Sequence, residues 1–150
     1  MTRYSRQISL PEIGEGGQEK LHKARVLIVG AGGLGSPAAL YLAGAGVGTI
    51  GLADDDTVGI SNLQRQVLYT ENEVGQLKVH CAAQRLRALN GNIEVHAYPF
   101  RLNRENARRL IADYDIVVDG CDNFSTRYLI SDSCSALHKP YAVSYTHLTL

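Results

Sequence analysis

The sequence predicts an α/β fold, with a Rossmann-like, doubly wound and mainly parallel sheet between two layers of helices. Two observations support this prediction. Short apolar runs alternate with longer segments of helical periodicity, and glycine or aspartate closes several of the apolar runs. Such alternation implies parallel strands joined by right-handed crossovers, in three layers of the order α/β/α. A chain of 150 residues is long enough for one such domain.

The first predicted strand and helix flank a glycine-rich turn. Residues 26–29 are a continuous apolar run that ends at glycine, which is typical of a strand buried on both faces. Residues 34–45 are rich in Ala and Leu and are predicted to form a helix. After a turn at Gly46, residues 49–53 are predicted to form a second strand, which ends at Asp54.

The middle of the chain supplies the next pair of elements after a polar, irregular segment at 55–69. Thr70 and Glu73 have the spacing of a capping box around a short turn. Residues 76–89 place their apolar side chains on one stripe at helical spacing. Residues 92–98 alternate apolar and polar side chains, which predicts a strand with one less buried face.

The last elements continue the alternation. Residues 104–112 are predicted to form a helix capped by Asn103. A buried strand at 116–118, a helix at 123–137 and a fifth strand at 140–144 follow. No internal repeat or linker interrupts this series, so a single domain is expected.

Composition narrows the function classes. Fifteen basic residues balance fifteen acidic ones, so no net field attracts nucleic acid or an anionic membrane, and neither is expected as a partner. The polar first six residues do not resemble a secretory signal, and the uncharged stretch 37–53 is too short and too glycine-rich for a membrane span. Cys81, Cys121 and Cys134 form no CxxC pair, so a reduced, cytoplasmic location is expected.

The segment from Gly30 to Gly35 carries the strongest chemical signal. Gly30, Gly32 and Gly35 fit the pattern GxGxxG between a strand and a helix, with Gly33 inside the turn. The first glycine permits the tight turn, the second lets a phosphate approach the backbone, and the third lets the helix pack closely on the strand. Backbone N–H groups and the positive end of the helix dipole favour an anion there. A nucleotide-binding loop is therefore predicted in preference to a packing turn.

The loop alone does not decide which nucleotide binds. Asp54 is placed to accept hydrogen bonds from ribose hydroxyls, which serves NAD as well as ATP. Taken alone, the glycine pattern and Asp54 favour an NAD-dependent oxidoreductase, and this alternative stays open.

Several short motifs gain meaning in combination. They are Arg3-Tyr4-Ser5-Arg6-Gln7, the loop Gly30–Gly35, the run Ser61-Asn62-Leu63-Gln64-Arg65, Lys78, and Asp119-Gly120-Cys121-Asp122-Asn123. Together they resemble the adenylyltransferases that activate ubiquitin-like sulfur carriers in molybdopterin and thiamine biosynthesis, which are bacterial relatives of ubiquitin-activating enzymes. The resemblance implies that the chain uses Mg-ATP to adenylate the C-terminal Gly-Gly carboxylate of a small carrier protein.

The resemblance also implies roles for individual residues. Asp122 is expected to hold Mg²⁺, and Arg65 and Lys78 are expected at the ATP phosphates. Arg6 is expected to reach the phosphates in the neighbouring subunit, which implies a homodimer with shared sites. Arg6, Arg65, Lys78 and Asp122 are thus the candidate catalytic residues. The candidate nucleotide-binding residues are Gly30, Gly32, Gly33, Gly35, Asp54, Ser61, Asn62, Leu63, Gln64, Arg65, Lys78, Asp122 and Asn123.

Without the resemblance, these residues have simpler interpretations. Lys78 is then a solvated helix lysine, and Arg6 and Arg65 are surface charges. Asp122 or Asn123 then serves as the N-cap of the following helix. Both interpretations of each residue therefore stay open.

The chemistry of adenylation explains why cations should dominate such a site. The attacking carboxylate is already ionised at pH 7, so the site must hold two anions together and stabilise charge on the phosphates. Asp56 and Asp119 are expected to have mainly structural roles. Cys121 lies between Asp119 and Asp122, whose charges disfavour the thiolate that a nucleophile requires.

The end of the chain departs from the family pattern. Residues 1–144 are predicted to be the ATP-binding adenylyltransferase domain, and residues 145–150 a tail that does not match. Family members continue with a carrier-binding groove, often a reactive cysteine, and two CxxC pairs for structural zinc, none of which this sequence contains. A chain that binds nucleotide but docks the carrier poorly is therefore expected, and a non-catalytic nucleotide-binding or dimerisation module stays open. The sequence does not distinguish the thiamine from the molybdopterin branch.

Overall fold

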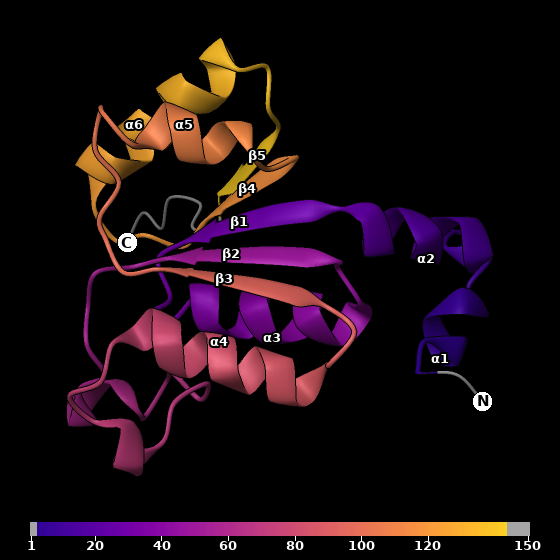
Figure 1. Ribbon diagram of the computed structural model, residues 1–150, viewed down its shortest axis with the longest axis horizontal. Helices are drawn as coiled ribbons and strands as arrows, with labels where there is room; N and C mark the ends of the chain where they lie inside the picture. The colour runs from indigo at the N-terminus through magenta and orange to yellow at the C-terminus, as the bar shows by residue number, and fades with distance from the viewer. Residues whose placement is uncertain (1–2, 144–150) are drawn as a thin grey trace, which may run out of the picture.

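The computed structural model describes residues 3–143 and confirms the predicted fold class (Figure 1). Five strands form one sheet in the order β3-β2-β1-β4-β5, and every neighbouring pair is parallel. The strands are β1 (Arg25–Val29), β2 (Thr49–Ala53), β3 (Glu94–Tyr98), β4 (Ile116–Asp119) and β5 (Tyr141–Val143).

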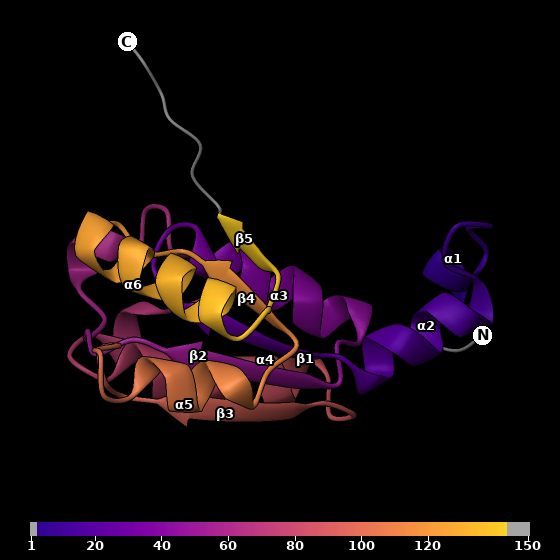
Figure 2. The same ribbon diagram turned by 90° about the horizontal axis from the view of Figure 1, so that it is seen from above.

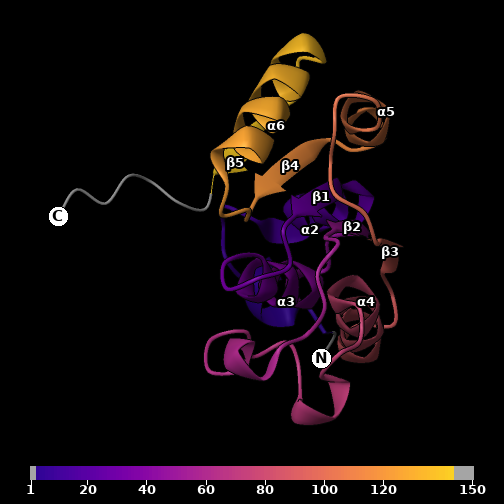
Figure 3. The same ribbon diagram turned by 90° about the vertical axis from the view of Figure 1, so that its left-hand side faces the viewer.

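Helices cover both faces of the sheet and create two separate cores. The covering helices are α3 (Gly35–Ala45), α4 (Lys78–Leu89), α5 (Ala107–Ala112) and α6 (Phe124–Ala136). In Figure 1, α3 and α4 lie below the strands and α5 and α6 above them, and Figure 3 shows the layers from one end. Leu27 belongs to the core between the sheet and helices α5 and α6, whereas its neighbour Ile28 belongs to the core between the sheet and helices α3 and α4. Because strand side chains alternate between faces, a strand between two helical layers must be apolar throughout.

Two helices that the apolar periodicity did not predict precede the sheet. α1 (Ser5–Ile8) and α2 (Gly14–Lys23) lie beyond the amino ends of the strands, at the right in Figures 1 and 2. Three of the ten residues of α2 are glycine, which lowers its intrinsic helix propensity. Its position is instead set by packing, since a β-carbon on Gly48 would lie 1.7 Å from the carbonyl oxygen of His22.

The predicted capping box is confirmed, whereas the helix cap predicted at Asn103 is wrong. Thr70 and Glu73 form the predicted capping box around a 3₁₀ turn. The side-chain oxygen of Asn123 accepts the N–H of Thr126 at 2.9 Å and so caps α6. Asn103 caps the turn before α5 rather than the helix itself, because the chain makes one further turn before regular helix begins. The other predicted helices and strands are present with boundaries shifted by at most three residues.

The strand order places a topological switch between β1 and β4. The chain runs outward from β1 through β2 to β3 and then crosses to β4, on the other side of β1. The connections after β1 and β4 therefore leave to opposite faces, which opens a crevice at the carboxyl ends of the strands. Val29 is in register with both Ala53 and Asp119, so the loops that follow these three strands begin side by side.

Two further predictions concern a membrane span and the last residues of the chain. Within residues 3–143, none of the helices combines the length and the apolar character needed to cross a bilayer. The predicted tail at 145–150 lies outside the described residues.

Candidate functional site

A pocket of about 960 Å³ lies at the carboxyl edge of the sheet, over the switch between β1 and β4. The loops that follow β1, β2, β3 and β4 form its walls, together with the first turns of α4 and α6. Its volume is in the range of sites that bind small molecules. The predicted site residues that line it are Gly30, Gly32, Gly33, Asp54, Asn62, Arg65, Lys78, Asp122 and Asn123.

Two glycines of the loop are required by the path of the backbone. Gly30 has a φ of +88°, and a β-carbon there would lie 2.8 Å from the backbone of Gly120. A β-carbon on Gly35 would lie 1.8 Å from the carbonyl oxygen of Gly30. This close approach lets α3 begin directly behind β1, so that its positive end faces the pocket.

Asp54 holds the glycine loop in place. Its two carboxylate oxygens accept the N–H of Ala31 at 2.7 Å and the N–H of Asp56 at 2.8 Å. The carbonyl of Ala31 is in turn held by the hydroxyls of Tyr69 and Ser36, at 2.7 and 3.0 Å. Burial raises the pKa of Tyr69, so this hydroxyl stays a donor. Each carboxylate oxygen has a second lone pair, so Asp54 can hold the loop and also accept a ribose hydroxyl.

Lys78 is buried, which differs from the solvated lysine that its helix position alone suggests. Only 4% of the residue is exposed, and its Nζ donates to Oδ2 of Asp56 at 2.7 Å. The hydrogen bond from Lys78 lowers the pKa of the Asp56 carboxyl. An ammonium group carries three donors, so Lys78 can keep this bond and still donate to an anion in the pocket. Asp56, expected to be structural, thus lines the pocket as the partner of Lys78.

The run from Ser61 to Arg65 contributes two side chains to the pocket. Oδ1 of Asn62 accepts the N–H of Gly59 at 3.0 Å, which closes a short 3₁₀ turn. The guanidinium of Arg65 donates to the carbonyl of Ser61 at 3.2 Å, and its stem lies beside Gly33. A β-carbon on Gly33 would lie 3.6 Å from the Arg65 side chain, an ordinary contact distance, so this placement of Arg65 does not itself require glycine.

Five predicted site residues do not line the pocket. Gly35 acts through the close backbone contact described above, and Leu63 packs against the core under α3 and α4. Ser61 and Gln64 are exposed. Arg6 lies on α1, at the opposite end of the molecule from the pocket (Figure 1).

A buried ion pair organises the loop after β4. Asp119 is fully buried and accepts from Nε of Arg127 at 3.2 Å and from the N–H and Sγ of Cys121 at 3.0 and 2.7 Å. Burial and then the hydrogen bond to Asp119 raise the pKa of the Cys121 thiol to about 11. The structure therefore confirms that the thiolate is disfavoured, with burial as the largest cause rather than the flanking charges. The structural role expected for Asp119 is also confirmed.

Asp122 and Asn123 have separate roles in the structure. The sequence left open whether Asp122 or Asn123 caps the following helix, and the structure shows that Asn123 is the N-cap of α6. Asp122 is exposed at the pocket, and its carboxylate has no hydrogen bond or ion pair with residues 3–143. No group of three or more metal-ligating side chains occurs in that part of the chain. Mg²⁺ is commonly held by one or two carboxylates together with substrate phosphates and water, and Asp122 fits that set of donors.

Other pocket residues were not among the predicted site residues. They are Asp55, Gln66, Phe100, Arg101, Leu102, Phe124, Thr126 and Arg127. Gln66 is 3% exposed, and its side-chain oxygen lacks a hydrogen-bond partner among the described residues. Phe100, Arg101 and Leu102 follow β3, so the rule that ligands bind at the carboxyl ends of strands could have found them.

Comparison with known proteins matches residues 4–147 to one family, described as the ThiF family. The sulfur carrier protein adenylyltransferase of Thermus thermophilus is 52% identical over 140 residues, which are 93% of this chain and 52% of that protein. The probable molybdopterin-synthase adenylyltransferase of Porphyra purpurea is 50% identical over 138 residues, which are 92% of this chain and 36% of that protein. The chain thus spans about half the length, or less, of these relatives.

A solved structure has the same fold. The E. coli tRNA N6-threonylcarbamoyladenosine dehydratase TcdA, in complex with ATP, superposes with a TM-score of 0.89 at 28% identity. The match covers 94% of this chain and 58% of that one. The fold, the glycine loop at the switch point and the match over residues 4–147 agree, and the chain belongs to the ThiF family.

Proposed function

We propose that this chain is the ATP-binding domain, residues 1–144, of a cytoplasmic enzyme that uses Mg-ATP to adenylate a ubiquitin-like sulfur carrier. The observation that carries the proposal is the burial of the Lys78 ammonium beside the glycine loop, in one pocket with Arg65. A buried cation and a loop of backbone N–H groups suit a polyphosphate. The names of the relatives, which are adenylyltransferases for a sulfur carrier and for molybdopterin synthase, support the type of substrate.

The reaction asks for positioning and charge stabilisation. An oxygen of the C-terminal Gly-Gly carboxylate bonds to the α-phosphorus of ATP, the bond from that phosphorus to the bridging oxygen breaks, and pyrophosphate leaves. The carboxylate needs no general base, because it is already ionised. Lys78 and Arg65 stabilise the charge on the phosphates, and the glycine loop orients them. Mg²⁺ held by Asp122 would neutralise further phosphate charge.

A homodimer with shared sites is part of the proposal. Arg6 is exposed and lies at the amino end of the strands, whereas the pocket lies at their carboxyl end. The docked position of α1 therefore holds Arg6 away from the pocket of its own copy. A second copy can supply it, as the motif resemblance implies.

NAD is the alternative ligand, and thermal unfolding separates the two. A ligand present at 100 times its Kd raises the free energy of unfolding by about 2.7 kcal/mol. Stabilisation by ATP with Mg²⁺ but not by NAD is expected. Stabilisation by NAD alone would replace the adenylyltransferase proposal with an oxidoreductase.

ATP–pyrophosphate exchange tests the reaction itself. It is measured with thiamine-branch and molybdopterin-branch carriers side by side, and with a carrier that lacks its final Gly-Gly as control. Exchange that depends on an intact carrier is expected of the full-length gene product, and the faster carrier identifies the branch; residues 1–150 alone are expected to bind ATP but to dock either carrier poorly. ATP binding without exchange by the full-length product, for either carrier, would instead indicate a non-catalytic nucleotide-binding module.

A further inference from the structure

The motif Arg3-Tyr4-Ser5-Arg6-Gln7 uses three side chains to attach α1 to the rest of the domain. The guanidinium of Arg3 donates to the carbonyl of Leu89 at 3.0 Å, at the end of α4. The amide of Gln7 donates to the carbonyl of Ala45 at 2.7 Å, at the end of α3. The last carbonyls of a helix lack partners within the helix, and the negative end of its dipole favours a cation such as Arg3.

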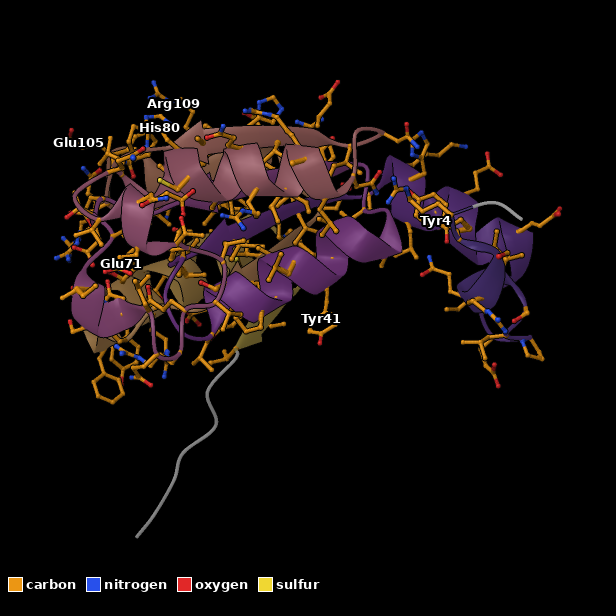
Figure 4. All side chains as sticks on the ribbon, turned by 90° about the horizontal axis from the view of Figure 1, so that it is seen from below. Tyr4, Tyr41, Glu71, His80, Glu105 and Arg109 are labelled. Carbon is orange, nitrogen blue, oxygen red and sulfur yellow. The ribbon has the colours of Figure 1, made fainter. Side chains whose placement is uncertain are left out.

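Tyr4 is the central contact of this attachment. Its hydroxyl accepts the side-chain N–H of Asn90 at 2.8 Å, and Asn90, fully buried, also donates to the carbonyl of Ala43 at 2.8 Å. The ring of Tyr4 lies over Gly46, where φ is +86° and a β-carbon would lie 2.6 Å from the ring. Figure 4 shows Tyr4 in the junction between the N-terminal helices and α3, whereas Tyr41 of α3 projects away from the molecule.

A second helix strengthens the same junction. Gln18 of α2 is buried and donates to the carbonyl of Ala45 at 3.1 Å, and its side-chain oxygen accepts from the amide of Gln7. A helix of four residues is not stable alone in water, so the position of α1 depends on these contacts. Arg6 takes no part in this attachment, because its side chain is exposed and bonds to none of the residues 3–143.

We propose that Arg3, Tyr4, Gln7 and Asn90, here termed the N-terminal clamp, fix α1 so that Arg6 is presented to the pocket of a second copy of this chain. This inference rests on the proposed function, in which Arg6 completes the neighbouring site. A rigidly attached arm loses less conformational entropy when its arginine binds a phosphate than a flexible tail does. Tyr4 is therefore a positioning residue that acts through Arg6. In this motif, Arg6 supplies the charge, and Arg3, Tyr4 and Gln7 hold it in position.

A double-mutant cycle tests whether Tyr4 acts through Arg6. Affinities for ATP and for adenosine are measured for the wild type, Tyr4→Ala, Arg6→Ala and the double variant. Tyr4→Ala is expected to weaken ATP binding about 10-fold, because Arg6 then loses one charge-assisted hydrogen bond to the phosphates. Adenosine binding is expected to stay unchanged, since adenosine has no phosphate. The double variant should bind ATP no more weakly than Arg6→Ala, because the lost contact is the same one.

Two further variants keep the result interpretable. Tyr4→Phe retains the ring over Gly46 and loses only the bond to Asn90, so a smaller effect in the same direction is expected even if Tyr4→Ala folds poorly. Tyr41→Ala, which removes a tyrosine that is 80% exposed, should change neither affinity. Unchanged ATP affinity in Tyr4→Phe and Tyr4→Ala, or an equal loss of ATP and adenosine binding, overturns the inference.

Mixing variants tests the second copy. Arg65→Ala supplies an intact α1 with an impaired pocket, and Tyr4→Ala supplies an intact pocket with a loosened α1. The mixture should recover about a quarter of the wild-type sites, because half of the dimers are mixed and one of the two sites in each is intact. No recovery above the separate variants overturns the inference, whereas a wild type that neither binds ATP nor catalyses exchange would reject the proposed function itself.

Discussion

Lys78→Met removes the buried cation of the pocket while keeping an unbranched side chain of similar length. Nζ of Lys78 lies 2.7 Å from Asp56, and its side chain is 5% exposed. A matched control exists in Lys23, whose Nζ lies 2.6 Å from Glu19 and whose side chain is 72% exposed. The two ion pairs have similar N–O distances and similarly exposed carboxylates, and they differ in the burial of the lysine, so Lys23→Met reports what an ordinary surface lysine contributes.

The expected magnitude follows from the contact that is lost. A hydrogen bond to a charged group contributes about 1.5–3 kcal/mol, so Lys78→Met should weaken ATP binding by about 10- to 150-fold. Adenosine binding should change little, since it lacks phosphate. The free energy of unfolding of the ligand-free chain should fall by less than about 1 kcal/mol, because an ion pair with an exposed partner contributes little and no uncompensated charge is left buried. The carboxylate left behind, Asp56, is 68% exposed and stays solvated.

Isothermal titration with ATP and Mg²⁺, and separately with adenosine, measures both affinities, and thermal unfolding measures stability. Lys23→Met should leave all three quantities unchanged. Equal ATP affinity in wild type and folded Lys78→Met would refute the placement of the ammonium group at the phosphates. An equal loss of ATP and adenosine binding would show a general disturbance of the pocket instead.

Three further predictions concern the backbone, pH and thiol chemistry. Gly35→Ala should destabilise the chain by about 1–3 kcal/mol in chemical denaturation through overpacking, since the new methyl would lie 1.8 Å from a carbonyl oxygen. The control is Gly44→Ala in the same helix, where the new methyl meets open space. This variant should stabilise the chain by about 0.5–1 kcal/mol. The hydrogen bond from Lys78 lowers the pKa of Asp56 in the folded chain. The ionised Asp56 carboxylate therefore stabilises the fold above the unfolded pKa of about 3.9, and this contribution is lost as pH falls through the lower folded pKa. Asp56→Asn should accordingly show a shallower loss of stability with acid. Cys121, with a pKa of about 11, should be alkylated in the native state only above about pH 10, and fast alkylation at pH 8 would contradict its burial.

Much of the fold could be predicted from the sequence because its signals are local. The apolar run at 26–29, the glycine pattern and the capping box at Thr70 each depend on neighbours a few residues away. Helix α2 was missed for the same reason: its glycines suppress the local signal, and its docking against β2 is not local.

The site was predicted in part. Its cations and glycines were found, but the sequence alone favoured a solvated Lys78, which the structure buries against Asp56. The pairing of Asp119 with Arg127 and the buried amide of Gln66 had no pattern that could reveal them. Each depends on how segments meet at the edge of the sheet, such as the end of β4 and the first turns of α6, and not on a residue spacing that the sequence displays.

The sequence by itself determined the alternation of strands and helices from the first strand onward, the anion-binding turn at Gly30 and the supply of cations. Only the tertiary structure decided which side chains meet in the pocket and which are held away from it. It attaches Tyr4 to Asn90, 86 residues further along the chain, and leaves Arg6 exposed at the far end from the pocket. The physical reason is that burial and pairing are properties of surfaces brought together by folding, whereas propensity and periodicity are properties of adjacent residues.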